Sequence, residues 1–212
     1  MATPSRLASL ARGKSLNLDI PKRESSEQDS IGSQIRRDLS IWQVSETLFI
    51  GICSEDVRKN FISNPPEKMF DFVGCLSLLN RNHLGRPDLD TYQMVGDQPG
   101  FSLEKITPDI TLRYNTKALG DNSGCSDQFE EQLPELLSIL DEYMEESKKN
   151  KRVLVLINCL VGAKRSCAVA MALLVKTKGV SVDESLAMIR ARRSFVSPPR
   201  GFVEVLKRYF GK

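Results

Sequence analysis

The sequence predicts an α/β fold around a largely parallel sheet, on the strength of two observations. From Ser40 onward, short apolar runs of strand composition alternate with helical stretches, as they do where helices connect parallel strands. The β-branched run 153–157 is followed, after a short loop, by an Ala- and Leu-rich stretch of helical composition that begins at Ser166. With 212 residues, 41% of them apolar, the chain can bury one core of good size.

The chain divides into a tail and one domain. Residues 1–38 are polar and contain no aromatic residue, which is typical of a disordered tail, so the domain is expected to cover residues 39–212. Strands are predicted at 47–50, 72–78, 110–114 and 153–157, and helices at 54–61, at 128–147 and from residue 166. Because proline is tolerated only near the start of a helix, Pro134 leaves the boundary of the helix at 128–147 open.

The loop after the strand at 153–157 has the residues of an anion site. Cys159 and Arg165 stand in it with five residues between them, and Gly162 allows the backbone to approach a ligand closely. The N-terminus of the following helix attracts anions and lowers the pKa of a thiol from about 8.5. Arg165 adds a planar fork of donors that matches two phosphate oxygens. A cysteine alone is more often a buried core residue, and an arginine alone is more often a solvated charge. The combination of Cys159, Gly162 and Arg165 in one loop predicts a thiolate phosphate-binding loop.

This loop resembles that of the cysteine-dependent protein phosphatases, and of their dual-specificity branch in particular. The family's loop reads His-Cys, five residues, then Arg-Ser or Arg-Thr, and this chain has Asn158, Cys159, Arg165 and Ser166 in that frame. Downstream, VSVDESLAMIRARRSFVSPPRGFVEVLKRYF is similar to the family's closing helices, and upstream IWQVSETLFIG is similar to its opening strands. The resemblance covers about residues 40–212. It implies a phosphatase-type sandwich with a central, mostly parallel sheet of about five strands flanked by helices.

The stretch 80–108 is predicted to be a long loop. It contains Gly, Pro, Asp and Asn and few periodic apolar positions. Compact members of the family connect these strands more briefly, so the resemblance implies an insertion, and loops of this length are usually functional or mobile.

Two carboxylates are candidates for the proton donor that ester cleavage requires. In the family the acid lies seven residues beyond an aromatic residue at a strand end and is commonly followed by Asn, which favours Asp121, since Tyr114 and Asn122 match. Asp127 is the alternative, because its separation from Cys159 is closer to that of short family members. A position at the start of the next helix also suits Asp127 as a helix cap.

The resemblance implies a mechanism and a set of site residues. The Cys159 thiolate attacks phosphorus, Asp121 protonates the leaving oxygen, and water then hydrolyses the phosphocysteine while Ser166 donates to the sulfur. Arg165 holds the phosphate oxygens together with the backbone of the residues between it and the nucleophile, which are Leu160, Val161, Gly162, Ala163 and Lys164. No cofactor and no metal are expected, and the only histidine, His83, makes a Cys–His protease improbable.

Some positions depart from the family's pattern. Asn158 replaces its His; it can donate a comparable hydrogen bond but carries no charge, so we expect a less depressed pKa for Cys159 and slower turnover. Lys164 stands where Ser is common and either adds positive charge beside Arg165 or points to solvent. Ser194 and Pro199 replace a Pro and an Asn, which changes how the final loop supports the site.

Three functions follow from the resemblance. The first is a protein phosphatase for phosphotyrosine and phosphoserine or phosphothreonine. A pseudophosphatase that binds phosphorylated partners is an alternative motivated by Asn158, and a phosphatase of a phosphoinositide, a phosphoglucan or an RNA end is one motivated by Lys164 and the inserted loop. A phosphoprotein substrate is the expected partner, with a protein kinase among the candidates, and a monomer is expected.

Charge and composition bound the remaining possibilities. A net charge of +3 argues for neither nucleic acid nor a membrane surface, and the basic cluster of Arg190, Arg192 and Arg193 is interpreted as a solvated helix end. No apolar run approaches the ~20 residues of a membrane span. We expect a cytoplasmic protein, with the nucleus as a second compartment. Organelle targeting is the alternative, because the first eighteen residues carry basic side chains and no acid.

The five cysteines lack the spacing of a disulfide framework, which indicates reduced thiols in an intracellular compartment. Cys75, Cys125 and Cys167 are candidates for a reversible disulfide with Cys159 under oxidation. Packing in the core is the preferred role of Cys75 and Cys167.

Overall fold

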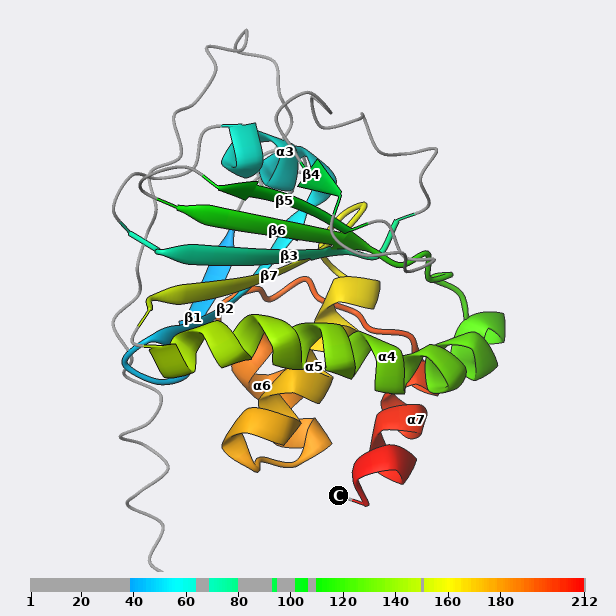
Figure 1. Ribbon diagram of the computed structural model, residues 1–212. Coiled ribbons are helices and arrows are strands. Elements are labelled where there is room, and N and C mark those ends of the chain that lie inside the picture. Colours follow the sequence, from blue (N-terminus) through cyan, green and yellow to red (C-terminus); the bar gives the residue numbers. More distant parts are fainter. Residues whose placement is uncertain are drawn as a thin grey trace, which may run out of the picture.

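The computed structural model describes residues 39–63, 69–79, 93–94, 102–106, 110–149 and 151–211, and the predicted tail at 1–38 lies outside them. The predicted α/β class is confirmed: a twisted sheet carries helices on both faces (Figure 1). Its strands are β1 (Ser40–Gln43), β2 (Leu48–Ser54), β3 (Phe72–Ser77), β4 (Gln93–Met94), β5 (Ser102–Ile106), β6 (Thr111–Thr116) and β7 (Val153–Cys159). The helices are α3 (Glu55–Ser63), α4 (Ser126–Glu145), α5 (Arg165–Lys178), α6 (Val182–Arg190) and α7 (Arg200–Phe210), with short 3-10 turns η4 (Ser123–Cys125) and η5 (Glu146–Lys149).

Four neighbouring strands form the parallel centre of the sheet. The strand order is β1-β2-β7-β3-β6-β5-β4, in which β2, β7, β3 and β6 run parallel. The outer strands β1, β5 and β4 pair antiparallel with their neighbours. Within the described residues the sheet is mostly parallel at its centre, as expected, and comprises seven strands where about five were predicted.

Two of the additional strands correct a sequence-based prediction. The stretch 80–108 was expected to be a loop, but it contains β4 and β5, which extend the sheet beyond β6. Strand β4 forms the edge of the sheet and β5 lies next to it. Short strands in this position need little apolar periodicity, so composition alone did not reveal them.

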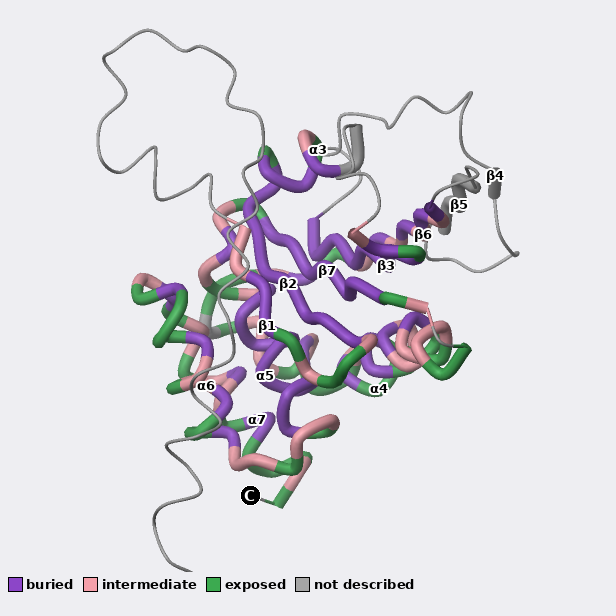
Figure 2. The backbone as a smooth tube through the Cα atoms, turned by 90° about the vertical axis from the view of Figure 1, so that its left-hand side faces the viewer, coloured by how far each residue is buried: buried purple, intermediate pink, exposed green. Residues whose placement is uncertain are grey.

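The strand that ends at Cys159 is buried along its whole length. Every residue of β7 is buried, as expected for a central parallel strand covered on both faces. Val155 and Ile157 belong to the core under α4, α5, α6 and α7, whereas Leu154 and Leu156 belong to the core under α3. Figure 2 shows this concentration of buried residues along the central strands and α5. The alternation fixes which face each side chain of β7 takes.

Helix α4 passes through Pro134 without ending there. It begins at Ser126, two residues before the predicted start, so Pro134 lies in its interior rather than in its first turn. A proline there removes one main-chain hydrogen bond. The helix persists because one of its faces is fully used in the core; that face consists of Phe129, Leu133, Leu136, Leu137, Leu140 and Tyr143.

The parallel centre brings four strand ends to one edge of the sheet. Ser54, Ser77, Thr116 and Cys159 are the last residues of β2, β3, β6 and β7. In open α/β sheets the carboxyl ends of the strands are where ligands bind. The loops that follow these four residues are therefore the place to look for a site.

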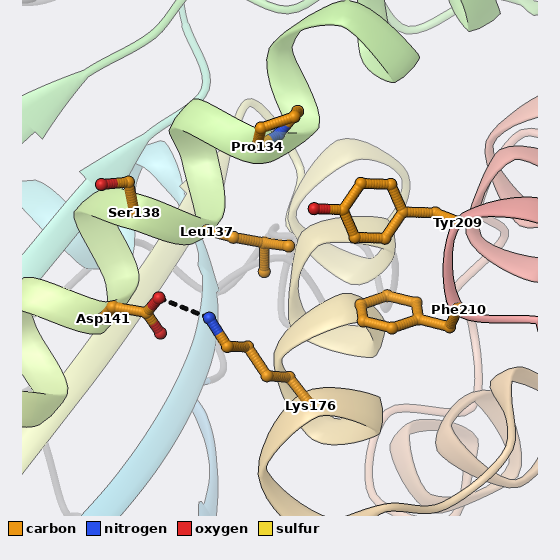
Figure 3. Close-up of a pocket in the computed structure, with 7 residues that line it drawn as sticks. All are labelled: Pro134, Leu137, Ser138, Asp141, Lys176, Tyr209 and Phe210. Atoms are coloured by element: carbon orange, nitrogen blue, oxygen red, sulfur yellow. Dashed lines mark hydrogen bonds and ion pairs between the residues drawn. The ribbon is translucent and has the colours of Figure 1, made fainter.

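A hollow of about 310 Å³ lies elsewhere, on the helical face between α4, α5 and α7 (Figure 3). Its charged lining residues, Asp141 and Lys176, bind each other, and Tyr209 and Phe210 cover one side. Lys176 lies near the C-terminal end of α5, whereas Cys159 precedes the N-terminal end of that helix. The hollow thus has neither the position nor the chemistry of the predicted site.

In the described part of the chain, no helix combines the length and the apolar content needed to cross a membrane.

Candidate active site

The predicted nucleophile, Cys159, lies at the bottom of the loop that joins β7 to α5. The residue is 2% exposed. Its Sγ lies 3.3 Å from the Oγ of Ser166 and accepts a hydrogen bond from the Gly162 N–H at 3.3 Å. Burial opposes ionisation of this thiol, but the Ser166 hydroxyl, the Ser166 N–H, the Arg165 charge and the Gly162 N–H together lower the pKa of Cys159 below its ordinary value. The site therefore favours a thiolate.

Arg165 is held from one side and open on the other. Its Nη1 donates to the carbonyl oxygens of Leu119 at 3.0 Å and Leu78 at 3.3 Å, so two loops fix the plane of the guanidinium. Its Nε is buried without a hydrogen-bond partner, and its Nη2 lies 3.7 Å from the Asp121 carboxylate. The Nε–Nη2 edge is the pair of donors that binds two oxygens of one anion. Arg165 thus offers a fixed fork, of which Nε has no hydrogen-bond partner and Nη2 has only the longer contact with Asp121.

The loop has a backbone that its own sequence dictates. Gly162 has φ +73°, and a Cβ there would lie 2.6 Å from the carbonyl carbon of Cys53, so only glycine fits. No side chain caps the start of α5 at Lys164. The first N–H groups of that helix are therefore left for an anion.

The side chains of the intervening loop residues differ in exposure. Leu160 and Lys164 are exposed, Val161 and Ala163 are half-buried, and Gly162 is buried. The exposure of Lys164 supports the interpretation that its side chain points to solvent. Leu160 is 57% exposed, so an apolar side chain stands at the rim beside the nucleophile.

The structure separates the two candidate acids. Asp121 lies in the loop after β6, with its carboxylate beside Arg165. Asp127 lies instead in the first turn of α4, with an exposed side chain, where the helix dipole favours a carboxylate. The N-cap of α4 is Cys125, so Asp127 is not the cap that the sequence suggested. Of the two, Asp121 is the one brought to the phosphate-binding loop.

The loop that carries Asp121 is held at both ends. Gln128 accepts a hydrogen bond from the Gly120 N–H at 3.1 Å and donates to the Ala118 carbonyl at 3.3 Å. On the other side, Cys125 Sγ contacts the Asn122 side-chain oxygen at 3.1 Å. The exposed Asp121 side chain therefore projects from a loop whose backbone is anchored.

Asn158, the residue before the nucleophile, is fully buried in a polar network. Its Nδ2 donates to Glu55 Oε2 at 2.7 Å, and its Oδ1 lies 3.8 Å from Cys75 Sγ, which donates to it. Glu55 in turn is bound by Arg58. Sequence reasoning missed Glu55 and Arg58, because the only signal was a charged pair that directly follows a strand.

A second buried arginine braces the loop from the opposite side. Arg193 is 2% exposed, and its side chain donates to the carbonyl oxygens of Gly162 at 2.8 Å and Val161 at 3.2 Å. The prediction that the basic cluster is a solvated helix end is therefore wrong for Arg193 and right for the exposed Arg190. A desolvated guanidinium is retained here because loop carbonyls satisfy its donors.

The final loop also contacts the phosphate-binding loop. The Ser197 N–H donates to the Ala163 carbonyl at 3.0 Å. The substituted Ser194 is exposed, and Pro199 is the N-cap of α7. The loop therefore supports the site through main-chain groups that these two replacements leave in place.

All five cysteines are free thiols. Burial raises the pKa of Cys75 and of Cys167 to about 12, which makes both poor thiolates beside Cys159. Cys125 is half-buried at the start of α4. The predicted reversible disulfide with Cys159 stays a prediction.

No cluster of three or more His, Cys, Asp or Glu side chains suited to a metal ion occurs among the described residues. The site itself offers three chemical groups. It combines a thiol with a lowered pKa, a rigid anion-binding fork and a carboxylate on the adjacent loop.

The comparisons with known proteins agree with this chemistry. Residues 111–212 match the family model for the dual specificity phosphatase catalytic domain. The matched segment contains Asp121, Cys159, Arg165 and Ser166.

Two curated relatives each match part of the chain. Dual specificity protein phosphatase Mpk3 of Drosophila melanogaster is 31% identical over 105 residues, which are 48% of this chain and 25% of that protein. Dual specificity protein phosphatase 5 of Rattus norvegicus is 39% identical over 75 residues, which are 35% of this chain and 18% of that protein. The chain spans a quarter or less of the length of these relatives.

Solved structures share the fold. Tk-PTP in its active form superposes with a TM-score of 0.51 at 17% identity, over 81% of this chain and 97% of that one. DUSP15 superposes with a TM-score of 0.50 at 15% identity, over 80% of this chain and 86% of that one. At these identities the likeness establishes the fold alone.

Proposed function

We propose that this chain is a dual-specificity phosphatase, which hydrolyses phosphotyrosine and phosphoserine or phosphothreonine in proteins through a phosphocysteine intermediate; the match of residues 111–212 to the family model supports this. One observation carries the proposal. The Sγ of Cys159 has a lowered pKa and lies within hydrogen-bond distance of Gly162 and Ser166, next to the guanidinium of Arg165.

Substrate binding uses the open edge of Arg165. The phosphate takes the Nε–Nη2 edge, where Nε has no partner in the free protein. The Asp121 carboxylate, 3.7 Å from Nη2, competes for the same donor. Binding of the phosphate therefore releases Asp121 from Arg165 and leaves its carboxyl group free to face the leaving oxygen.

The first chemical step transfers the phosphoryl group to sulfur. The Cys159 thiolate attacks phosphorus in line, a P–S bond forms, and the P–O bond to the substrate breaks while Asp121 gives its proton to the departing oxygen. Arg165 and the loop N–H groups hold the equatorial oxygens, where charge is stabilised.

The second step regenerates the thiolate. Water attacks phosphorus and gives a proton to Asp121, the P–S bond breaks, and the sulfur leaves as the thiolate. Ser166, with its Oγ 3.3 Å from Sγ, donates a hydrogen bond to the departing sulfur. Phosphate then leaves the loop.

A phosphoprotein is the substrate that the family implies. We propose in addition that a protein kinase is among its partners, that the protein acts as a monomer, and that it works in the cytoplasm and nucleus. We also propose that residues 39–212 form the catalytic domain behind a disordered tail.

The test compares the native protein with Cys159→Ser, which keeps the size of the side chain and removes the nucleophile. Substrates are p-nitrophenyl phosphate, a phosphotyrosine peptide, a phosphothreonine peptide and a phosphoinositide. We expect turnover of the aryl phosphate and both peptides by the native protein and none by Cys159→Ser.

Two outcomes contradict the proposal. Equal, negligible rates for both proteins, with retained phosphopeptide binding, would indicate a binding protein. Much faster turnover of the phosphoinositide than of either peptide would indicate a lipid phosphatase.

A further inference from the structure

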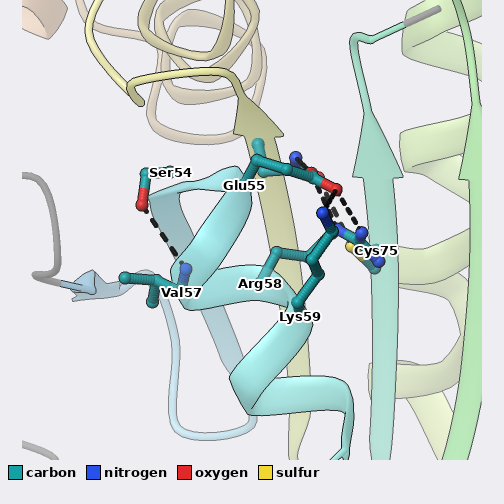
Figure 4. A network of polar contacts seen from close by, with 7 residues as sticks. Ser54, Glu55, Val57, Arg58, Lys59 and Cys75 are labelled. Carbon is teal, nitrogen blue, oxygen red and sulfur yellow. Dashed lines mark hydrogen bonds and ion pairs between the residues drawn. The ribbon is translucent and has the colours of Figure 1, made fainter. Parts of the chain in front are cut away.

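A buried charge pair lies directly behind the phosphate-binding loop, in the first turn of α3 (Figure 4). Glu55 is 4% exposed and Arg58 2%. Arg58 Nε donates to Glu55 Oε2 at 2.9 Å, and its Nη2 binds Oε1. Buried pairs of this kind carry a large desolvation cost and seldom stabilise a fold on balance. The pair therefore calls for a role beyond stability.

Glu55 contacts the residues on both sides of the nucleophile. Its carboxylate accepts a hydrogen bond from Asn158 Nδ2 at 2.7 Å, and its backbone N–H donates to the Leu160 carbonyl at 3.3 Å. Asn158 immediately precedes Cys159, and Leu160 immediately follows it. One residue of α3 thus holds the chain at both neighbours of the sulfur-bearing residue.

The amide of Asn158 has its orientation fixed by this contact. Its oxygen accepts from Cys75 Sγ, on the neighbouring strand β3, and its nitrogen donates to Glu55. Flipping the amide would turn an oxygen toward the Glu55 carboxylate and an N–H toward the thiol. Both contacts thus favour the observed orientation.

We propose that Glu55 is a positioning residue for the nucleophile, which acts through Asn158 and Leu160 to hold Cys159 against its hydrogen-bond donors. The proposal rests on the proposed function in one respect, that Cys159 is the group being positioned. The donors in question are the Gly162 N–H and the Ser166 side chain, whose alignment lowers the pKa of the thiol.

Arg58 makes this arrangement compatible with a thiolate. An unpaired buried carboxylate near the loop would oppose a second negative charge, whereas the ion pair with Arg58 cancels it. Arg58 is itself fixed, since its guanidinium lies 5.0 Å from the centre of the Tyr114 ring. Lys59 adds a longer contact, with its Nζ 3.7 Å from Glu55 Oε1.

The test compares two double variants with the same charge. Glu55→Gln/Arg58→Met retains an oxygen that can accept from Asn158, and Glu55→Leu/Arg58→Met does not. The pH dependence of Cys159 alkylation by iodoacetamide, followed by peptide mass spectrometry, reports the thiol without any turnover. Asp56→Asn, at the exposed neighbouring position of α3, is the control and should match the native protein.

We expect the alkylation midpoint of the Leu variant to lie about one pH unit above that of the Gln variant, which corresponds to about a tenfold smaller thiolate fraction at pH values below both midpoints. The kcat for p-nitrophenyl phosphate should be lower in the Leu variant than in the Gln variant, because the thiolate fraction is smaller, and KM should change less. In an Asn158→Ala background the difference between the two variants should vanish, because the bridged amide is gone.

Equal midpoints in the folded Gln and Leu variants overturn the proposal, as does a difference that persists in the Asn158→Ala background. If the Leu variant does not fold, Asn158→Ala alone takes its place and should raise the midpoint similarly; an unchanged midpoint then overturns the proposal. Absence of turnover in the native protein would contradict the proposed function. The alkylation midpoints would still test the role of Glu55, because alkylation needs no turnover.

Discussion

At the scale of single residues, the site reconciles a buried thiol with a lowered pKa. Burial alone raises the pKa of a cysteine, as it does for Cys75 and Cys167. Cys159 is buried as well, but the hydrogen bonds to its sulfur and the charge of Arg165 lower its pKa by more than burial raises it. The difference lies in the loop after β7 and the first turn of α5, which supply the N–H group of Gly162 and both the N–H and the hydroxyl of Ser166.

Replacing Ser166 by Ala removes the largest contribution that lowers the pKa of Cys159. The pKa of Cys159 should therefore rise, and the acidic limb of the pH profile of kcat/KM should move to higher pH. The profile is measured with p-nitrophenyl phosphate, and the exposed Ser138→Ala on α4 serves as control. A limb that stays in place would show that Ser166 does not tune the thiol.

Asp121→Asn should lower kcat for a phosphothreonine peptide by about 10²–10⁴-fold, because the alkoxide leaving group needs a proton. The loss with p-nitrophenyl phosphate should be much smaller, since nitrophenolate leaves without protonation. Steady-state rates for both substrates, with Asp127→Asn as the matched control, decide the assignment. A larger loss in Asp127→Asn than in Asp121→Asn would exchange the roles of the two residues.

At the scale of elements, α4 illustrates how tertiary packing overrides a local signal. Six buried side chains on one face hold the helix through Pro134, whose own side chain is exposed. A proline in a helix interior removes one hydrogen bond and costs roughly 3 kcal/mol relative to alanine. The free energy gained by burying the apolar face exceeds this cost, so the helix starts at Ser126 and continues to Glu145.

Pro134→Ala should accordingly stabilise the protein by about 1–3 kcal/mol, since alanine restores the missing hydrogen bond and fits the helix. Urea unfolding followed by circular dichroism measures the change, with Ser138→Ala one turn further along as the control. A loss of stability would mean that the packing of the proline ring beside Tyr209 contributes more free energy than the main-chain hydrogen bond that alanine restores.

At the scale of the whole molecule, strand order assembles the site from distant segments. Because β7 lies between β2 and β3, the end of β7 meets Glu55 after β2 and Leu78 after β3, and β6 delivers Asp121. The register aligns Cys53 with Asn158, which puts Glu55 beside the loop across 103 residues of sequence. The position of β7 in the sheet thus brings the residues of the site together.

This dependence explains what the sequence could and could not predict. Cys159 and Arg165 lie in one contiguous segment, so their spacing alone predicted an anion site, and the apolar run before them predicted its strand. Glu55 and Arg193 act on the same loop from remote segments, and nothing local distinguishes them from solvated charges. Strand β5 and the edge strand β4 were missed because pairing rather than composition defines them.

The helical layer depends on an aromatic contact between α4 and α7. The rings of Phe129 and Phe202 are stacked with centroids 4.3 Å apart, and both are fully buried. Phe202→Ala should therefore destabilise the protein by about 3–5 kcal/mol through lost packing and a cavity. Chemical unfolding measures the loss, and the exposed Tyr209→Ala on α7 should cost far less. Equal losses would place the main helix–helix contact elsewhere.

The most direct test of the central claim is to observe the covalent intermediate. Ser166→Ala should slow departure of the sulfur more than its attack, so the phosphoenzyme should accumulate when p-nitrophenyl phosphate is mixed with this variant and quenched rapidly. Peptide mass spectrometry should then find one phosphoryl group on Cys159, and none in the Cys159→Ser/Ser166→Ala double variant. Steady turnover of the substrate by the native protein, with no phosphoryl group on Cys159 in the variant at any quench time, would contradict the mechanism.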